Sequence, residues 1–518
     1  VGMMPRLLRW GLLLTGWALI LPMMGQEPGT LDTDFQDGGM LLLAPFGETS
    51  FENAQDVIAL DDGSIVFCGV VGTAGNFDVA VLKLDPEGNL DPTFGTDGAY
   101  VFENDLSSDQ AYSMAALPDG RIAVGGAMGF GASDYRATVW CLLPDGTPDP
   151  DFGTEGRFQY TFDDGEEYIR RVLVTENFIT LVATVKVPGF SYDRIGLVQC
   201  THDGLLDQGF GQDGAIIHTI DETTDLSVRD GERMSTGGIA VCGYHYNMSD
   251  NTEYPFIGLF DANGQPQADF GTGGIIIADN QPGEYFAAAT HGDILYFAGR
   301  TNGDAQDFMI DALEVDGTTH TPFALYGHFE LDNAMTDLIL DLAVDEEGRL
   351  LASGTSGIPG FFGDRDFALL RLTPDGWPDP LFGTNGITTT SFGPAFDDAN
   401  ALVITPENKA VLVGMSAQTN NDFAIARYFL GPVTNSVEEL HLTAGVFPNP
   451  TSNTVRIPLD TRSGQCSLWS VTGSAIPLNL RKTGTYTEVE MGHLPNGTYF
   501  LTIETPSGRH SERIVVQH

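Results

Sequence analysis

Carboxylates are the side chains with the most obvious chemical potential in this sequence, and many of them recur at regular spacing. One series stands at or just before a short β-type segment: Glu52, Asp109, Glu166 with Glu167, Asp225, Glu284, Asp337, and Asp397 with Asp398. Regular spacing predicts that they gather on one face of a repeating fold. Hard cations prefer oxygen ligands, so this face would suit Ca²⁺ or a basic partner. A solvated turn face is the favoured alternative, because none shows the D-x-[DN]-x-[DN]-G spacing of a calcium loop.

A second series of aspartates opens another β-type segment in six of the repeating units: Asp78, Asp134, Asp193, Asp307, Asp366 and Asp422. A catalytic group is needed only once in an enzyme. An aspartate that recurs in most units is more typical of local hydrogen bonds to backbone amides. We therefore predict a structural role for this series.

Other reactive side chains form no recognisable pattern. The ten histidines are scattered, and the sequence has no H-E-x-x-H, G-x-S-x-G, P-loop or dinucleotide-binding motif. His245 is predicted to be a surface loop residue. Cys68 and Cys242, like Cys141 and Cys200, fall on matching segments of different units, which predicts separations beyond the limit of about 7 Å for a disulfide. These patterns require no cofactor and single out no catalytic residue.

The composition excludes nucleic acid as a natural partner. The 518 residues contain 24 Lys+Arg and 71 Asp+Glu, a net charge of −47, whereas phosphate binding needs a basic face. A hydrophobic content of 42% still allows large cores. The 63 glycines indicate many turns and therefore many short strands.

The first 25 residues are typical of a secretory signal peptide. Arg6 and Arg9 precede an apolar run from Trp10 to Leu21, and Gly25 and Gln26 follow it. A helix of that length rises only about 18 Å, too short for a transmembrane span. The protein is therefore expected to be secreted.

A repeat of about 58 residues organises most of the chain. Its most regular feature is a phenylalanine that is followed four residues later by glycine: Phe35, Phe94, Phe152, Phe210, Phe270, Phe323 and Phe382. Such a period is typical of a repeat architecture. The unit at Phe323 departs most from the pattern. We expect the phenylalanines to act as wedges between neighbouring units.

Four short β-type segments in each of seven units predict an all-β, seven-bladed β-propeller over residues 26–430. The third segment ends in a small residue, in most units glycine, which would let neighbouring backbone approach closely. The pattern predicts a complete first blade and a complete last one, so no blade is expected to be shared between the ends of the domain. Residues 31–35 are expected to dock against residues 428–430.

Segments such as Leu90-Asp-Pro-Thr-Phe94-Gly-Thr-Asp-Gly98 and Asp366-Phe-Ala-Leu-Leu-Arg371 resemble the delta-60 repeats of secreted bacterial proteins. The resemblance covers about residues 29–430. It implies a propeller and names no reaction.

The last seventy residues are predicted to be a separate module. Residues 431–445 are typical of a linker, and residues 446–518 predict a small Ig-like β-sandwich. Pro448, Asn449, Pro450, Gly497 and Tyr499 resemble the C-terminal sorting domain of the type IX (Por) secretion system. The resemblance implies the type IX machinery as a partner and a location outside the cell or on its surface. The alternative is an ordinary Ig-like adhesion module.

Binding residues are expected among the loops that do not repeat. The aromatic candidates on or beside these loops are Phe130, Tyr135, Phe190, Tyr192, Tyr244, Tyr246, Phe361 and Phe362. Exposed aromatic rings suit recognition of carbohydrate or protein surfaces, and the alternative is that they only anchor their loops.

The preferred hypothesis is a non-enzymatic propeller that binds an extracellular protein or glycan. The alternatives are a hydrolase or lyase with a carboxylate pair in the central channel, and a structural surface-layer component. A deep axial pocket with two convergent, non-repeating carboxylates would favour the enzyme.

Overall fold

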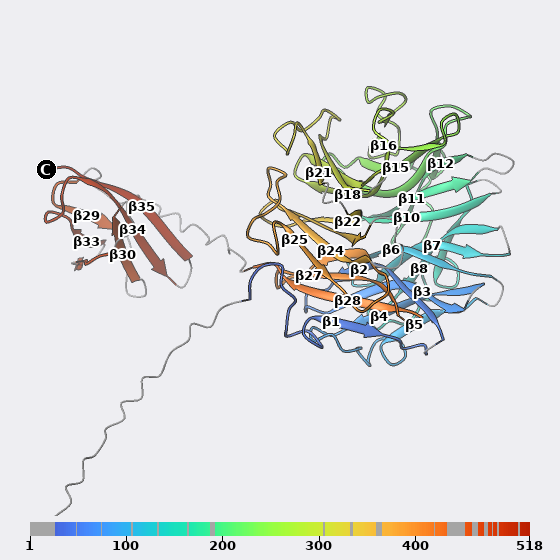
Figure 1. Cartoon of the computed structure of the whole chain (residues 1–518), viewed down its shortest axis with the longest axis horizontal. Coiled ribbons are helices and arrows are strands. Elements are labelled where there is room, and N and C mark those ends of the chain that lie inside the picture. Colours follow the sequence, from blue (N-terminus) through green and yellow to red (C-terminus); the bar gives the residue numbers. More distant parts are fainter. Residues whose placement is uncertain are drawn as a thin grey trace, which may run out of the picture. The chain divides into compact units, whose positions relative to one another are not determined.

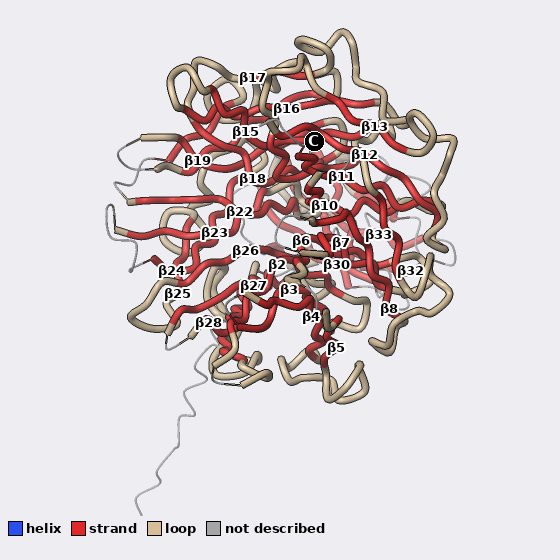
Figure 2. Tube along the Cα trace, turned by 90° about the vertical axis from the view of Figure 1, so that its right-hand side faces the viewer, coloured by secondary structure: helices blue, strands red, loops and turns tan. Residues whose placement is uncertain are grey.

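Seven four-stranded antiparallel sheets make up the larger part of the computed structural model (Figure 1). The structure describes residues 26–431, except for 48, 74, 105–106, 132–133, 163–164, 187–191, 304–305, 332–334, 359–364 and 419. Of the remainder it describes 451–457, 465–470, 475–478, 480–483, 486–505 and 508–518. The predicted signal peptide and most of the predicted linker lie outside these residues. The described residues form strands and loops, without helices (Figure 2).

Each blade begins with an inner strand and runs outward. Blades one to three contain β2 (Phe51–Ala59), β3 (Ile65–Thr73), β4 (Asn76–Leu84) and β5 (Ala99–Phe102); β6 (Gln110–Ala116), β7 (Ile122–Gly129), β8 (Tyr135–Leu142) and β9 (Arg157–Tyr160); and β10 (Glu166–Val174), β11 (Phe178–Lys186), β12 (Asp193–Thr201) and β13 (Ala215–His218).

Blades four to six contain β14 (Ser227–Arg233), β15 (Ile239–Asn247), β16 (Thr252–Phe260) and β17 (Ile275–Ile277); β18 (Gly283–His291), β19 (Ile294–Thr301), β20 (Phe308–Glu314) and β21 (His328–Leu331); and β22 (Thr336–Val344), β23 (Leu350–Gly357), β24 (Arg365–Leu372) and β25 (Ile387–Thr390). Blade seven contains β26 (Asp397–Ile404), β27 (Lys409–Ala417), β28 (Asn421–Phe429) and, as its outer strand, β1 (Met40–Leu43).

The ring is closed by a blade that both ends of the domain share, so the expectation of complete first and last blades is wrong. The first β-type segment of each sequence unit is the outer strand of the preceding blade. For the first unit that blade is the last one, and β1 therefore pairs with β28 from Met40↔Ala426 to Leu43↔Phe423. Closure thus uses backbone hydrogen bonds in addition to packing.

The segment before β1 strengthens this closure in the predicted place. Leu31 forms a β-bridge with Tyr428. The buried Asp32 carboxylate accepts from Arg427 Nε at 2.8 Å and lies 3.1 Å from Lys409 Nζ. The predicted contact between residues 31–35 and the end of the last blade is confirmed.

Hydrophobic packing occurs between blades. Seven apolar clusters of described residues each combine side chains of two neighbouring blades. The seven repeated phenylalanines are at most 4% exposed. Phe94, for example, lies under Gly146 of the next unit, where an added Cβ would approach its ring to 2.7 Å. The prediction that these rings act as wedges between neighbouring units is confirmed.

Every inner strand carries a β-bulge at the same place, and this bulge explains the small residue of the second strand. In blade six the register shifts between Ile339 and Asp341, opposite Gly354. A Cβ on Gly354 would lie 1.8 Å from the Leu338 carbonyl oxygen. The close backbone approach that the sequence predicted is confirmed, although the glycine stands in the middle of its strand.

The contacts of the chain divide it after Gly431, and residues 432–518 form a second compact unit. One sheet pairs β29 (Thr454–Ile457), β33 (Tyr486–Glu490) and β32 (Leu480–Thr483). The other pairs β31 (Ala475–Ile476), β30 (Gln465–Ser470), β34 (Gly497–Thr505) and β35 (Gly508–Val516). Both sheets contribute to one apolar cluster, for example Val455, Val489, Leu468 and Leu501. The Ig-like arrangement of this unit stays a prediction.

Candidate functional site

The seven bulges place one extra residue from each inner strand into the central channel. These bulge residues are Gln55, Tyr112, Arg170, Arg229, Phe286, Leu340 and Asn400. All seven line one small cavity of about 60 Å³, near the end of the channel where the inner strands begin. We call them the bulge ring. The backbone position repeats, but the seven side chains differ in charge, size and polarity.

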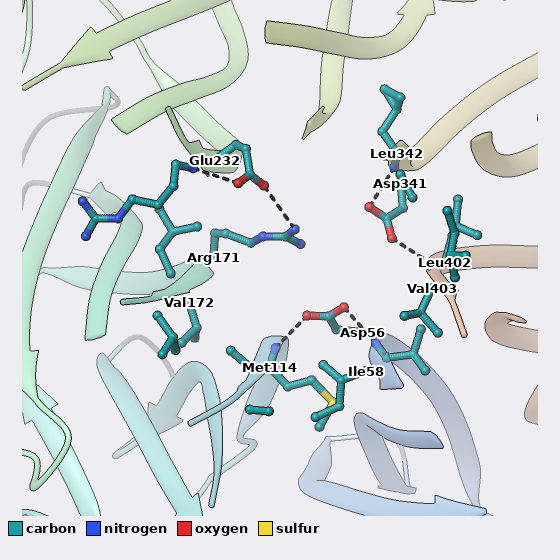
Figure 3. A pocket seen from close by; sticks show the side chains of 18 of the residues that line it. Asp56, Ile58, Met114, Arg171, Val172, Glu232, Asp341, Leu342, Leu402 and Val403 are labelled. Carbon is teal, nitrogen blue, oxygen red and sulfur yellow. Dashed lines mark hydrogen bonds and ion pairs between the residues drawn. The ribbon is translucent and has the colours of Figure 1, made fainter. Parts of the chain in front are cut away.

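The residue after the bulge has a different role, because in four blades it joins neighbouring inner strands. Asp56 accepts a hydrogen bond from Met114 N at 2.6 Å, Asp230 from Ala288 N at 2.8 Å, and Asp341 from Leu402 N at 2.7 Å. Ser113 does the same for Val172 N at 3.1 Å. Asp56 and Asp341 also accept from the next amide of their own strands at 2.8 Å (Figure 3).

Arg171 extends from blade three into the middle of these carboxylates (Figure 3). Its Nε atom lies 3.5 Å from Asp230 Oδ1, and its Nη2 atom lies 3.9 Å from Glu232 Oε2. Burial raises the pKa of the Asp341 carboxyl to about 7, against the opposing attraction of Arg171. The pKa of Arg171 is itself raised, chiefly by Asp230. A single guanidinium thus holds several buried acids together.

A wider cavity of about 480 Å³ lies on the other side of Arg171. Its walls are the second halves of the inner strands, with apolar side chains such as Ile58, Leu173, Val344 and Val403. Asp56, Arg171 and Asp341 line both this cavity and the smaller one. These three side chains therefore separate the two ends of the channel.

The channel carboxylates do not form the arrangement that would favour an enzyme. Asp56, Asp230 and Asp341 occupy the same position in blades one, four and six, and each accepts a hydrogen bond from the backbone of the next blade. A carboxylate held by amides at both oxygens, as in Asp56 and Asp341, has little freedom to serve as nucleophile or base.

The first carboxylate series turns inward, so the prediction of a solvated turn face is wrong. Glu52, Asp109, Glu167, Asp225, Glu284, Asp337 and Asp397 are at most 8% exposed. Several of them accept hydrogen bonds from backbone amides close to the start of the inner strand. Glu52 accepts from Phe46 N at 3.2 Å, and Asp397 accepts from Phe392 N at 2.8 Å. Burial raises the pKa of Glu52 to about 7 and that of Asp397 to about 6.

Metal binding by this series stays an untested prediction. Within the described ranges, no cluster of three or more His, Cys, Asp or Glu side chains is placed to hold a metal ion.

On the side of the loops, the arginines and aromatic rings of the bulge ring contact one another and further aromatic side chains. The Arg170 guanidinium lies 4.4 Å from the centre of the Tyr112 ring and 5.4 Å from that of Tyr168. The Arg229 guanidinium lies 5.1 Å from the Tyr244 ring and 5.3 Å from the Phe286 ring. Arg229 Nε also donates to Glu284 Oε1 at 2.6 Å. These contacts join blades two to five into one cationic and aromatic surface.

The predicted aromatic residues fall into four groups. Tyr135 packs against Tyr168 at 5.5 Å, and Tyr244 lies beside Arg229, so both adjoin this surface. Phe130 lies under its neighbour Arg136 at 4.1 Å, and Tyr246 donates to Asn251 at 2.6 Å within its own hairpin. Tyr192, directly before β12, is half-buried. Phe190, Phe361 and Phe362 lie outside the described residues.

In the second unit, Tyr499 is buried in the apolar cluster and its hydroxyl donates to Pro495 O at 2.9 Å. Gly497 begins β34. Pro448, Asn449 and Pro450 lie outside the described residues.

Sequence reasoning missed the bulge ring. Tyr112, Arg170 and Arg229 lie on strands that follow the general repeat pattern, and attention to the loops passed over them. The available signal was charge, because Arg170-Arg171 and Arg229 are unusual in a chain with only 24 basic residues.

A separate polar group that does not repeat lines a cavity of about 320 Å³ between blades four and five. Tyr285 donates to Asp311 Oδ2 at 2.5 Å, and His328 Nδ1 lies 2.8 Å from Asp311 Oδ1. The hydrogen bond to Asp311 raises the pKa of His328. This group belongs to the part of the chain where the sequence repeat is least regular.

Two other predictions concern reactive side chains. Cys68, Cys141, Cys200 and Cys242 are buried free thiols, as expected. His245 is half-buried on β15, rather than exposed in a loop, and its Nδ1 atom lies 2.9 Å from Asp225 O. None of the described residues belongs to a helix that is long and apolar enough to cross a membrane.

Comparison with protein families identifies both parts of the chain. Residues 445–517 match the secretion system C-terminal sorting domain. Residues 60–94, 117–152 and 348–382 match the domain of unknown function DUF5122, a β-propeller. The resemblance to a delta-60 propeller with a type IX sorting domain is confirmed, and the sorting domain directs export to the cell surface or beyond. No curated protein matches the sequence.

Several solved structures resemble the propeller at low identity. A protein of unknown function from Dyadobacter fermentans has a TM-score of 0.41 and 11% identity, covering 76% of this chain and 98% of that one. The β-propeller domain of the Trilobed protease from Pyrococcus furiosus has a TM-score of 0.38 and 9% identity, and the match covers 76% of this chain and 99% of that one. Pyrococcus horikoshii acylaminoacyl peptidase has a TM-score of 0.40 and 10% identity, and the match covers 78% of this chain and 57% of the peptidase.

Proposed function

We propose that this propeller, exported by type IX secretion, is a binding protein that recognises an extracellular protein or carbohydrate at the loop-bearing end of its central channel. The observation that carries the proposal is the bulge ring. Seven equivalent backbone positions present seven different groups, among them Gln55, Arg170, Phe286 and Asn400, to one cavity. A position under structural constraint alone would be expected to carry similar residues in each blade.

The side chains in and around this ring favour a role in recognition over a purely structural role. Tyr112, Tyr168, Tyr244 and Phe286 provide aromatic area beside two arginines. Aromatic and arginine side chains are enriched where proteins bind partners, because they combine large contact area with directed hydrogen bonds. The non-repeating loops enter the same end of the propeller.

The hydrolase or lyase alternative receives less support. Its carboxylates would be Asp56, Asp230 and Asp341, which are equivalent by repeat and accept backbone hydrogen bonds between blades. An enzyme would require at least one of them to leave its amide partner during the reaction.

A screen of the purified protein against glycan arrays and extracellular proteins tests the proposal. Tyr112→Ala and Tyr244→Ala should weaken any specific binding at least several-fold. Trp377→Ser is the matched control, because Trp377 is a 54% exposed aromatic in the turn between β24 and β25, at the opposite end of its blade. Binding that depends on Trp377 and is indifferent to Tyr112 and Tyr244 would contradict the proposal.

A further inference from the structure

We propose that the bulge ring binds the carboxylate of a sugar acid, with Arg170 as its principal partner and with the hydroxyl groups of the sugar at the surrounding carboxylates. This inference rests on the proposed binding function and names its ligand class.

Arg170 is a cation without an ion-pair partner. Among the described residues no carboxylate lies within ion-pair distance of it, and its Nε atom is buried without a hydrogen-bond partner. Its ring contacts are the faces of Tyr112 and Tyr168. Burial lowers the pKa of Arg170 and the nearby Arg229 adds to this shift, while Tyr112 and the more distant Asp193 oppose it. Such an arrangement is costly in the free protein and becomes favourable when an anion binds.

The other arginines of the inner strands already have partners. Arg171 pairs with Asp230 and Glu232, and Arg229 pairs with Glu284. Arg233 donates to Gly237 O at 2.9 Å and to Thr180 Oγ1 at 2.5 Å. A chain with 71 acidic residues and 24 basic ones has carboxylates in excess, so a shortage of acids does not explain why Arg170 has no ion-pair partner.

The cavity limits the size of the anionic group. Its volume of about 60 Å³ admits a few water molecules or one carboxylate, and is too small for a complete sugar ring. Arg170, Arg171 and Arg229 all line it. Because Asp56 and Asp341 accept amide hydrogen bonds at both oxygens, their charge is already partly compensated.

The region around the cavity favours a ligand with one negative charge and several hydroxyl groups. Three carboxylates, Asp56, Asp230 and Asp341, line the same cavity as the arginines. Carboxylate oxygens accept hydrogen bonds from sugar hydroxyls. The same carboxylates and the net charge of −47 repel polyanions. A sugar acid meets both conditions, whereas an acidic protein or a highly sulfated chain does not.

Calorimetric titration of the purified protein with three saccharides tests the inference: an oligosaccharide ending in glucuronic acid, the same oligosaccharide ending in glucose, and a form sulfated on that terminal glucose. The glucuronic acid form should bind at least tenfold more tightly than the glucose form and more tightly than the sulfated form. Its affinity should fall as the salt concentration rises.

Arg170→Gln should abolish this preference for the acid, and Arg170→Lys should retain part of it because the charge remains. Arg157→Gln is the matched control, since the Arg157 side chain is 31% exposed on the outer strand of its blade and pairs with the 78% exposed Glu155. The melting temperature of Arg170→Gln should equal or exceed that of the unchanged protein, because a partly buried cation without an ion-pair partner is removed.

The outcomes separate this inference from the proposed function. Equal binding of the acid and glucose forms, or an acid preference that survives in Arg170→Gln, would overturn the sugar-acid assignment while the binding function stands. Stronger binding of the sulfated form would also overturn it, in favour of a sulfate. Failure of every saccharide and every protein in the wider screen would overturn both.

Discussion

The residue at each bulge and the residue that follows it are neighbours in sequence, yet they follow opposite rules. In four of the seven blades the following position carries Asp56, Ser113, Asp230 or Asp341, whose side chains accept a backbone hydrogen bond from the next blade. In the other three blades it carries Arg171, Ala287 and Ala401. The bulge position presents different side chains to the small cavity. In this repeat protein, a position whose side chain supports the fold and a position whose side chain varies from blade to blade can be direct neighbours in the sequence.

The two ends of the channel reflect the same division. The wide end is walled mostly by apolar side chains of the inner strands, while the narrow end combines three arginines and three aspartates with aromatic and amide groups. Four experiments test this contrast, in order of decreasing expected effect.

Arg171→Met should destabilise the propeller by about 3–5 kcal/mol, because it leaves Asp230 and its neighbouring carboxylates without their cation in a buried setting. Chemical denaturation of the variant and of the unchanged protein measures the difference. Arg157→Met provides the control, with an expected change below about 0.5 kcal/mol, because Arg157 lies partly exposed on an outer strand and its partner Glu155 is exposed. Equal stability of Arg171→Met and the unchanged protein would show that Arg171 does not hold the channel together.

Gly354→Ala should cost about 1–3 kcal/mol, because the new Cβ would lie 1.8 Å from the Leu338 carbonyl oxygen and the bulge would have to move. The chain itself offers the control, since Ala183 occupies the equivalent place in blade three opposite Ile169. Ala183→Gly should therefore change stability by at most about 1 kcal/mol. Thermal unfolding of both variants checks the contrast, and a stable Gly354→Ala would refute the bulge explanation.

The stability of the propeller should fall as the pH rises from about 5 to 8. Burial raises the pKa of Glu52 and Asp341 to about 7 and of Asp109, Asp225 and Asp397 to about 6. Unfolded carboxyls lose their protons near pH 4, so between these values the folded state binds more protons and rising pH favours unfolding.

Melting temperatures across this range measure the trend, with about 1 °C expected for each kcal/mol in a domain of this size. Glu52→Gln should flatten the dependence, because it removes one of the raised groups. A melting temperature that rises steadily from pH 5 to 8 would contradict the account.

The smallest effects are expected from the two loop tyrosines. Tyr244→Ala should weaken ligand binding several-fold, since its ring lies 5.1 Å from the Arg229 guanidinium. Tyr246→Ala should leave the affinity within about twofold, because the Tyr246 hydroxyl is bonded within its own hairpin. Titration of both variants with the same ligand compares them. Equal losses would place the ligand on the hairpin instead of the channel.

The sequence was sufficient for most of the fold because the repeat is regular in the residues that pack. The buried phenylalanines and the mid-strand glycines predict the wedge contacts and the close backbone approach that the structure shows. Ring closure was missed because the sequence unit and the blade are out of phase by one strand. That offset depends on which strands pair, and β1 and β28 are almost 400 residues apart.

The candidate site was less predictable for a related reason. A bulge adds one residue to a strand and reverses the direction of the side chains beyond it, so alternation alone does not place Arg170 and Arg171. The inward orientation of Glu52 and Asp397 was equally hidden, because a carboxylate beside a turn is exposed in most proteins.

A crystal structure from crystals of the protein soaked in a sugar acid tests the central claim most directly. We predict a carboxylate within hydrogen-bond distance of the Arg170 guanidinium, inside the ring formed by the seven bulge residues. A ligand seated in the wide apolar cavity, or on the loops with Arg170 untouched, would contradict the account.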